Sequence, residues 1–273
     1  MDLINILDMT NPASNSSSAP LIERVRHPFR SRHVQVLARD MITPGFVRLT
    51  VGGPEMDEFI SAGFDDHVKL ILPQAGQEKP NLPTVVDGRP HIEGARPTMR
   101  DYTPLLHDAA ANTLTLDFAI HGTGPAADWA REAPIGQWLG LAGPRGSMVV
   151  PTDLDWHILL GDETAIPAIE RRLSELPATT RAIVRVQVAN PADQRTWTSR
   201  AALDCAFVPS LVDAVEKLEL PEGDGFIWGA GESTLMVALR AQWVAKGANA
   251  KRMRMSSYWK KGVADHHEDL VAP

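Results

Sequence analysis

Cysteine is nearly absent from this sequence, and so is any pattern of metal ligands. Cys205 is the single cysteine among 273 residues, which excludes an internal disulfide and any zinc or iron–sulfur site built from several cysteines. The nine histidines are scattered without ligand spacing. His266 and His267 are adjacent but lie near the C-terminus, where disorder is the commoner outcome. We therefore assign no metal site.

Long hydrophobic runs are also missing. No uncharged apolar stretch approaches the roughly 20 residues that span a bilayer. The apolar residues between Asp2 and Asp8 have no basic flank in front of them, unlike those of an export signal. Together with the low cysteine content, these absences favour a cytoplasmic protein without a membrane span.

An excess of positive charge is absent too. The formal net charge is -7, which disfavours a general nucleic-acid binder because phosphate is repelled. With 44% hydrophobic and 22% charged residues, the composition is that of an ordinary globular protein. The length favours two medium domains, and small molecules are the expected partners.

The first half of the chain predicts an antiparallel β-barrel over residues 30–150. Residues 1–29 are expected to be a mobile leader, because 10–20 is rich in Ser, Asn, Ala and Pro. Short β-branched or alternating runs follow, separated by Gly and Pro turns, and 73–98 is typical of a long excursion between strands. The runs are Val34–Ala38, Phe46–Val51, Val68–Leu72, Leu114–Ile120 and Trp138–Leu141.

The second half, residues 151–273, predicts an α/β domain with a parallel sheet. Apolar residues recur at helical spacing between short apolar runs, and this alternation is typical of a sheet with both faces covered. An antiparallel barrel followed by an open α/β sheet leaves a cleft between two domains, where a cofactor commonly sits. We expect strands at 156–160, 183–188, 226–228 and 253–258, and helices near 166–176, 211–218 and 235–246.

Two segments of the first half have residues suited to a cofactor. In the extended segment 100–104, Arg100 and Tyr102 share a face, so a guanidinium can pair with a diphosphate while an aromatic ring lies along a flat ligand. Thr103 can offer a hydroxyl to a ring nitrogen. A solvated strand accounts for the same residues equally well.

The second segment is 121–130, where small residues and a proline begin a helix. Free backbone N–H groups and the helix dipole favour an anion at such a position. A plain turn into a short helix is the alternative. Asp128, in the first turn, would oppose a phosphate if it faced one.

Together these segments resemble the siderophore-interacting protein family, FAD-dependent ferric-siderophore reductases related to ferredoxin-NADP reductases. Order and spacing match over nearly the whole chain from about Arg30, and this conjunction is far more specific than any single motif. The matching segments are 65–70 (DDHVKL), 100–104 (RDYTP), 121–130 (HGTGPAADWA), 143–147 (GPRGS), 161–167 (GDETAIP), 228–232 (WGAGE) and 258–262 (YWKKG).

The resemblance implies an FAD site in the first domain. Arg100 would bind phosphate, Tyr102 would stack on the isoalloxazine and Thr103 would contact its edge, so that Tyr102 and Thr103 are the expected catalytic residues. The diphosphate would lie against His121, Gly124, Ala126 and Ala127. Leu105 is a departure, because many relatives carry a second arginine there; its loss would weaken FAD binding or alter the approach of an anionic substrate.

The resemblance places NADPH or NADH on the second domain. The loop with Asp162, Thr164 and Ala165 follows a strand as a nucleotide-binding turn would, although the acidic residues there equally fit a helix cap. It lacks the Gly-rich dinucleotide fingerprint. The remaining expected cofactor residues are Gly229, Ala230, Gly231, Glu232, Tyr258 and Trp259, of which the last two also fit simple packing of a strand.

A local reversal of charge occurs near the C-terminus. Six basic and no acidic residues lie between Lys246 and Lys261, which is consistent with a solvated face or with steering of an anionic ferric chelate or an acidic carrier such as ferredoxin. We expect substrate contacts from Arg252, Arg254, Lys260 and Lys261.

The predicted function is electron transfer from NAD(P)H through FAD to a ferric siderophore. A nicotinamide releases two electrons as hydride and iron(III) accepts one, so a flavin is the suitable intermediary. Iron(II) is held less tightly by hard oxygen ligands and leaves. The alternatives are a flavin reductase with another acceptor and a ferric-chelate binder without tight FAD.

Overall fold

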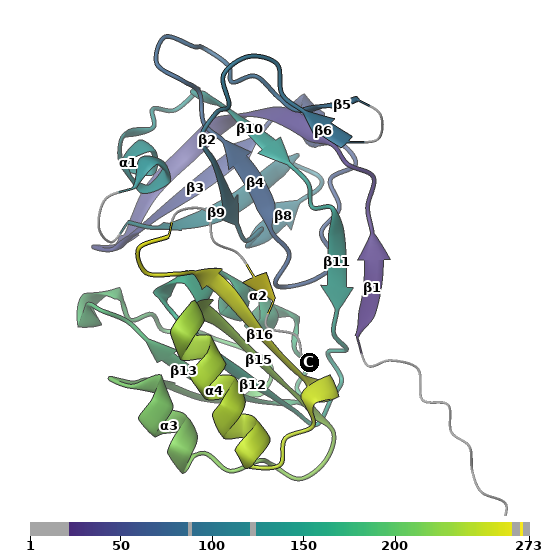
Figure 1. The fold of residues 1–273 in the computed structure, drawn as a ribbon, viewed down its shortest axis with the longest axis vertical. Helices are drawn as coiled ribbons and strands as arrows, with labels where there is room; N and C mark the ends of the chain where they lie inside the picture. Colours follow the sequence, from purple (N-terminus) through teal and green to yellow (C-terminus); the bar gives the residue numbers. More distant parts are fainter. Residues whose placement is uncertain (1–21, 87–88, 121–123, 264–267, 270–273) are drawn as a thin grey trace, which may run out of the picture.

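The structure is a computed structural model, and it describes residues 22–86, 89–120, 124–263 and 268–269. Two sheet-based lobes lie one above the other, joined by the segment between β11 and β12 (Figure 1). The two-domain, ferredoxin-reductase-like fold class predicted from the sequence is confirmed.

The N-terminal lobe is a curved antiparallel sheet of seven strands in the order β7-β4-β10-β2-β3-β9-β8. Alternate residues of β3 and β9 are buried, because one face of the sheet points into the core while the other faces outward. Bulges in the pairing of β2 with β3 bend the long strand β2. The strands are β2 (Ser31–Thr43), β3 (Phe46–Gly52), β4 (Val68–Ile71), β7 (Met99–Tyr102), β8 (Leu106–Asp108), β9 (Thr113–Ala119) and β10 (Trp138–Ala142).

The five strand runs expected in this lobe are all present, and the sequence missed smaller elements. The expected leader, 1–29, overlaps β1 (Glu23–Arg26), which pairs with β11 (Gly146–Val149) as part of the fold, and residues 1–21 lie outside the described ranges. The excursion 73–98 carries the hairpin of β5 (Thr84–Val86) and β6 (Arg89–His91). A short 3-10 helix, η1 (Pro54–Met56), follows β3, and α1 (Pro125–Glu132) packs against β9 and β3.

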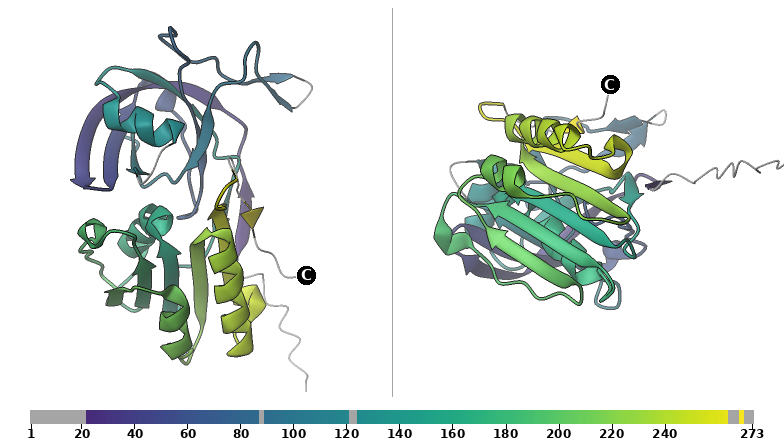
Figure 2. Two further views of the ribbon diagram at one scale, coloured as in Figure 1. Left: turned by 60° about the vertical axis from the view of Figure 1, so that its left-hand side comes forward. Right: turned by 90° about the horizontal axis from the view of Figure 1, so that it is seen from below.

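The C-terminal lobe is a parallel sheet in the order β14-β13-β12-β15-β16, with β17 added antiparallel. Both faces are covered, so neighbouring residues of β12 are buried on opposite sides: Leu159 packs with α2, and Ile158 and Leu160 pack with α3 and α4. Figure 2 shows α3 and α4 together on one face. The strands are β12 (Trp156–Asp162), β13 (Arg181–Gln187), β14 (Ala202–Phe207), β15 (Gly225–Glu232), β16 (Met253–Trp259) and β17 (Glu268–Asp269).

The helices of this lobe are α2 (Ile166–Glu175), α3 (Leu211–Lys217) and α4 (Ser233–Ala245), with 3-10 turns η2 (Glu163–Ala165), η3 (Pro191–Asp193) and η4 (Ala250–Arg252). Strand β12 is the first strand of this sheet along the chain, and it lies in the middle of the sheet between β13 and β15. The chain direction across the sheet therefore reverses between β12 and β15, and ligands of open parallel sheets bind at the carboxyl ends of such a pair.

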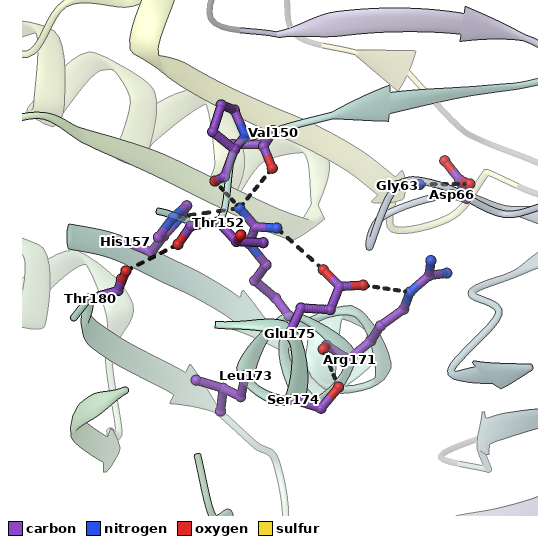
Figure 3. Close-up of polar contacts among 12 residues, drawn as sticks. Gly63, Asp66, Val150, Thr152, His157, Arg171, Leu173, Ser174, Glu175 and Thr180 are labelled. Atoms are coloured by element: carbon purple, nitrogen blue, oxygen red, sulfur yellow. Dashed lines mark hydrogen bonds and ion pairs between the residues drawn. The ribbon is translucent and has the colours of Figure 1, made fainter. Parts of the chain in front are cut away.

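A buried arginine anchors the connection between the lobes. Arg172 of α2 donates hydrogen bonds to the carbonyl oxygens of Val150 and Pro151, and its Nη2 lies 3.5 Å from Nε2 of the fully buried His157. Glu175 accepts an ion pair from it at 3.2 Å (Figure 3). The linker between β11 and β12 is thus bound to the helix that faces the N-terminal lobe.

Candidate active site

A cleft lies between the lobes and is lined by both. Its N-terminal wall has Phe46, His67, Asp101, Tyr102, Thr103, Asp117 and Ala119, and its C-terminal wall has Glu163, Thr164, Pro167 and Tyr258. Strand β7 ends at this cleft, as do the carboxyl ends of β12 and β16. The antiparallel sheet and the switch point of the parallel sheet therefore face the same space.

Tyr102 presents a flat aromatic wall to the cleft. Its ring lies 4.2 Å from that of Phe118, centroid to centroid, and the ring of Trp129 in α1 lies 6.2 Å from the same Phe118 ring. Burial raises the pKa of Tyr102, so the phenol is neutral at physiological pH. Thr103 follows it, is buried, and lines the same cleft. The structure thus brings the two expected catalytic residues together with α1.

The start of α1 is suited to an anion. The N-cap is Gly124 in an extended conformation without a side-chain cap, and Pro125 opens the helix. A Cβ built on Gly124 would meet nothing within 4 Å in the described part of the chain. The first-turn N–H groups of Ala126 and Ala127 therefore have room for a phosphate. Asp128 does not oppose one, because its carboxylate pairs with Arg131 at 2.5 Å. His121 lies outside the described residues.

Arg100, the residue expected to bind the FAD phosphate, does not line the cleft. Its guanidinium donates to the carbonyl oxygen of Met99 at 2.7 Å. Asp101 lines the cleft instead and binds Lys69 through both carboxylate oxygens, at 2.7 and 2.9 Å. Leu105 is buried, so this position supplies no charge.

The two lobes are held together along the cleft by buried ion pairs. The carboxylate of Asp117 on β9 accepts Arg48 Nε and Arg195 Nη1, both at 2.6 Å, and its side chain is fully buried. Glu170 of α2 binds the same two arginines at 2.9 Å. Because Arg195 and Glu170 belong to the C-terminal lobe, this cluster fixes one wall of the cleft against the other.

Arg171 of α2 connects the C-terminal lobe to the end of the tyrosine-bearing segment. Its guanidinium donates to the carbonyl oxygens of Pro104 and Ser61, each at 2.9 Å, and to Ser61 Oγ at 2.8 Å. Its Nε binds Glu175, the partner of Arg172 (Figure 3). The backbone just after Thr103 is therefore positioned by a helix of the other lobe.

Asp162 organises the carboxyl edge of the parallel sheet. One carboxylate oxygen accepts Thr164 N at 2.9 Å and Thr164 Oγ1 at 2.5 Å. The other accepts Glu232 N at 2.8 Å and Trp259 Nε1 at 2.9 Å. Burial raises the pKa of Asp162, and these four donors oppose that shift. The sequence left open whether Asp162 caps a helix or belongs to a cofactor loop. In the structure it caps η2 and also connects the carboxyl ends of β12, β15 and β16.

Small residues let these strand ends approach one another. A Cβ on Gly231 would lie 2.5 Å from the Asp162 carboxylate, and one on Gly161 would lie 2.2 Å from the Ala165 side chain. Gly229 and Ala230 are buried inside β15, so they shape the sheet and are not exposed to a ligand. Glu232 ends the strand and caps α4 through Leu235 N at 3.0 Å.

The aromatic residues of β16 separate. Tyr258 lines the cleft, with its ring centroid 6.4 Å from that of Trp228, whereas Trp259 is 40% exposed and is tethered to Asp162. Both lie at the carboxyl edge, where the sequence placed them.

The four basic residues expected to contact the substrate do not form one group. Arg252 precedes β16, at the amino end of the sheet and away from the cleft, and pairs with Asp224 at 3.2 Å. Arg254 donates to the buried Asp65 at 3.0 Å. Lys260 and Lys261 are exposed at the opposite end of the strand. Because a strand carries residues 252 and 260 to opposite edges of the sheet, the four residues do not form a single rim, and their contact with a substrate stays a prediction.

The structure reveals a basic pocket beside the cleft that the sequence analysis missed. We call the cavity lined by His67, Lys69, His91, Arg96 and Arg145 the basic pocket; Phe29, Pro83, Met99 and Gly143 also contribute to it. Its volume is 480 Å³, within the range typical of small-molecule sites. Lys69 and Arg145 occur in recognised segments, but His91 and Arg96 lie in the excursion 73–98, which carried no sequence signal for binding.

Comparison with known proteins decides the family. Residues 35–148 match the siderophore-interacting FAD-binding domain, and residues 154–262 match the siderophore-interacting protein domain. The chain belongs to the siderophore-interacting protein family. It is 37% identical over 247 residues to the NADPH-dependent ferric-chelate reductase of Escherichia coli K12, covering 87% of this chain and 96% of that protein.

Other members of the family are similar over most of their length. The ferric vibriobactin reductase ViuB of Vibrio cholerae is 27% identical over 256 residues, covering 87% of this chain and 93% of that one. The crystal structure of a siderophore utilization protein from T. fusca superposes with a TM-score of 0.83 at 32% identity, covering 90% and 98%. SipS from Aeromonas hydrophila gives 0.73 at 26% identity, covering 86% and 94%.

Within the described residues there is neither a cluster of metal ligands nor a membrane-spanning helix. No group of three or more His, Cys, Asp or Glu in the described ranges could hold a metal ion. No helix within these ranges is both long and apolar enough to cross a membrane.

Proposed function

We propose that this protein is an FAD-dependent reductase that takes electrons from NADPH and passes them singly to a ferric siderophore. The observation that carries the proposal is the shared cleft. Across this cleft, the aromatic wall of the antiparallel sheet faces the carboxyl edge of the parallel sheet at its switch point. Membership of a family with an FAD-binding domain supports the assignment.

The residues of the N-terminal wall fit FAD. Tyr102 supplies the surface for a flat ring, Thr103 a hydroxyl at its edge, and the N–H groups of Ala126 and Ala127 a site for phosphate. Arg100 would support the phosphate after turning from the Met99 carbonyl. When bound, the flavin accepts hydride and releases electrons one at a time.

The carboxyl edge of the parallel sheet fits NADPH. Thr164 and Glu163 line the cleft, and Gly231, which has no side chain, lets the end of β15 approach the Asp162 carboxylate closely. The relative from E. coli is named for NADPH, which favours it over NADH as the donor. Ferredoxin, the other donor considered, has no support among the relatives. Tyr258 and Pro167 close this wall with apolar surface and keep water from the transfer.

The basic pocket fits the ferric chelate. Siderophore complexes are often anionic, and Lys69, Arg96 and Arg145 would attract one and hold it beside the cleft. The pocket shares His67 with the cleft, so a chelate there would lie close to the ring bound against Tyr102. This assignment is an alternative to the predicted rim of Arg252, Arg254, Lys260 and Lys261.

The visible spectrum of the purified protein, recorded with and without added FAD, tests the function. We expect flavin bands and NADPH oxidation that depends on a ferric siderophore, with iron(II) captured by a colorimetric chelator. If flavin bands are present but NADPH is oxidised only when another electron acceptor is added, the protein is a flavin reductase with a different acceptor. No flavin binding and no NADPH oxidation would indicate the non-catalytic binder.

Tyr102→Ala tests the flavin site directly. Removing the ring should weaken FAD binding and restore flavin fluorescence, because stacked aromatic rings quench it and contribute about 1 kcal/mol. Titration of the apoprotein with FAD measures both effects, with Tyr258→Ala as a matched aromatic control on the opposite wall. Unchanged affinity and fluorescence in Tyr102→Ala would contradict the assignment.

A further inference from the structure

One imidazole lines both cavities of this protein. His67 contributes to the cleft together with Tyr102 and Thr103, and to the basic pocket together with Lys69 and Arg145. The residue is exposed, so its ring is accessible from these spaces. Histidine is the side chain that most often acts as a general acid or base in catalysis.

The backbone around His67 is held in place by both lobes. The preceding Asp65 accepts Trp228 Nε1 at 3.1 Å and Arg254 Nε at 3.0 Å, both from the C-terminal lobe. Asp66 accepts Ser147 Oγ at 2.6 Å and is buried. The following residue, Val68, begins β4 opposite Tyr102. The histidine therefore lies at a defined point beside the tyrosine and is not on a loose loop.

The proposed reaction releases a proton on one side of His67 and consumes protons on the other. Each NADPH supplies two electrons and one proton as hydride, and two iron(III) ions accept one electron each. One proton therefore remains in the cleft for every two iron(II) formed. In the basic pocket, the chelate oxygens that lose iron(II) take up protons at neutral pH, because they are basic once free of the metal.

The other ionisable groups lining these cavities are poorly placed to carry that proton. Tyr102 retains its own, because burial raises its pKa. Arginines remain protonated. The carboxylates of Asp101 and Asp117 are occupied by Lys69 and by Arg48 and Arg195. Glu163 lines only the cleft, and His91 only the basic pocket.

We propose that His67 is a catalytic residue that relays protons from the flavin cleft to the oxygen donors of the ferric chelate as iron is reduced. This inference rests on the proposed function. It adds a step that the binding sites alone do not supply: the imidazole takes the proton left by hydride transfer and gives it to a chelate oxygen as the iron–oxygen bond breaks.

His67→Gln tests the relay, because glutamine keeps a polar side chain of similar size but does not titrate. The control is His33→Gln, at a histidine that lines neither cavity and is hydrogen-bonded to the carbonyl oxygen of Pro80 at 2.9 Å. The probe is the iron(III) complex of 2,3-dihydroxybenzoate, an anionic catecholate, and its gallium(III) analogue reports binding without reduction. Ferricyanide serves as an oxidant whose reduction needs no proton.

Reduced protein is mixed with each oxidant in a stopped-flow instrument between pH 6 and 8.5. We expect His67→Gln to slow reoxidation by the ferric catecholate at least about tenfold at saturating chelate and to flatten its pH dependence. FAD affinity, gallium-chelate affinity and reoxidation by ferricyanide should match the wild type, as should every rate of His33→Gln.

Three results would overturn the inference. Equal rates for His67→Gln and wild type with the ferric catecholate would show that no proton passes through His67. An equal slowing with ferricyanide would show that His67 acts at the flavin and does not deliver protons to the chelate. A loss of gallium-chelate affinity would show that His67 only positions the chelate. A wild-type protein that binds no FAD or is not oxidised by the chelate would refute the proposed function itself, which is a distinct outcome.

Discussion

Acidification is expected to destabilise the C-terminal lobe through His157, the buried imidazole beneath the interlobe linker. The side chain is fully buried, and the guanidinium of Arg172 lies beside its Nε2. Burial, and secondarily the charge of Arg172, lower the pKa of His157 from 6.5 to about 3 in the folded protein. The folded state therefore keeps this ring neutral at a pH where the unfolded chain protonates it.

The sign and size follow from linkage. Below pH 6.5 the unfolded state binds a proton that the native state does not, so the free energy of unfolding falls as the pH falls toward 3. The slope approaches about 1.4 kcal/mol per pH unit, and the loss between neutral pH and pH 5 is about 2 kcal/mol from this one group. Against a typical total of about 5–15 kcal/mol, such a loss is readily measured.

Urea unfolding at pH 7.5 and pH 5 measures the effect in the wild type and in His157→Leu. Leucine fills the site without titrating, and Arg172 keeps the carbonyl oxygens of Val150 and Pro151 as acceptors. We compare the change with pH within each protein, so a constant packing cost cancels. His91→Gln, at an exposed histidine, is the control. If wild type and His157→Leu lose the same free energy on acidification, the reasoning is refuted.

Two further substitutions test the framework of the cleft. Asp162→Asn leaves one acceptor oxygen for four donors, so we expect weaker NADPH binding and a loss of about 1–3 kcal/mol in stability, with FAD affinity unchanged. Calorimetric titration with NADP⁺ measures the dinucleotide affinity. Unaltered NADP⁺ binding would show that Asp162 does not organise the dinucleotide site. Arg171→Met removes the donors to the carbonyl oxygens of Pro104 and Ser61, so FAD affinity should fall several-fold. The control Arg181→Met, at an exposed arginine, should leave FAD affinity unchanged. Equal FAD affinities in the two variants would show that α2 does not position the N-terminal wall of the cleft.

Local patterns carried much of the fold. Period-2 runs such as Phe46–Val51 predicted β3, and helical spacing at Ile166, Ile169 and Leu173 predicted α2, because each pattern reflects burial of one face over a few residues. Strand β14 was missed, since an edge strand with partly exposed residues has no alternation to detect. The recognised segments also predicted Tyr102, Thr103 and Gly124 as cofactor residues. Each lies at a short local element, the end of β7 or the start of α1, that a sequence motif can cover.

By itself, then, the sequence determined the two-lobe architecture and the family, and it predicted which residues are suited to a flavin. Only the tertiary structure decided which distant residues meet. The basic pocket joins Lys69, Arg96 and Arg145, Asp162 receives donors from β15 and β16, and Arg252 and Lys260 are carried to opposite edges of the sheet. Such meetings depend on strand order and on crossovers between strands. Neither leaves a periodic signal in the residues they bring together.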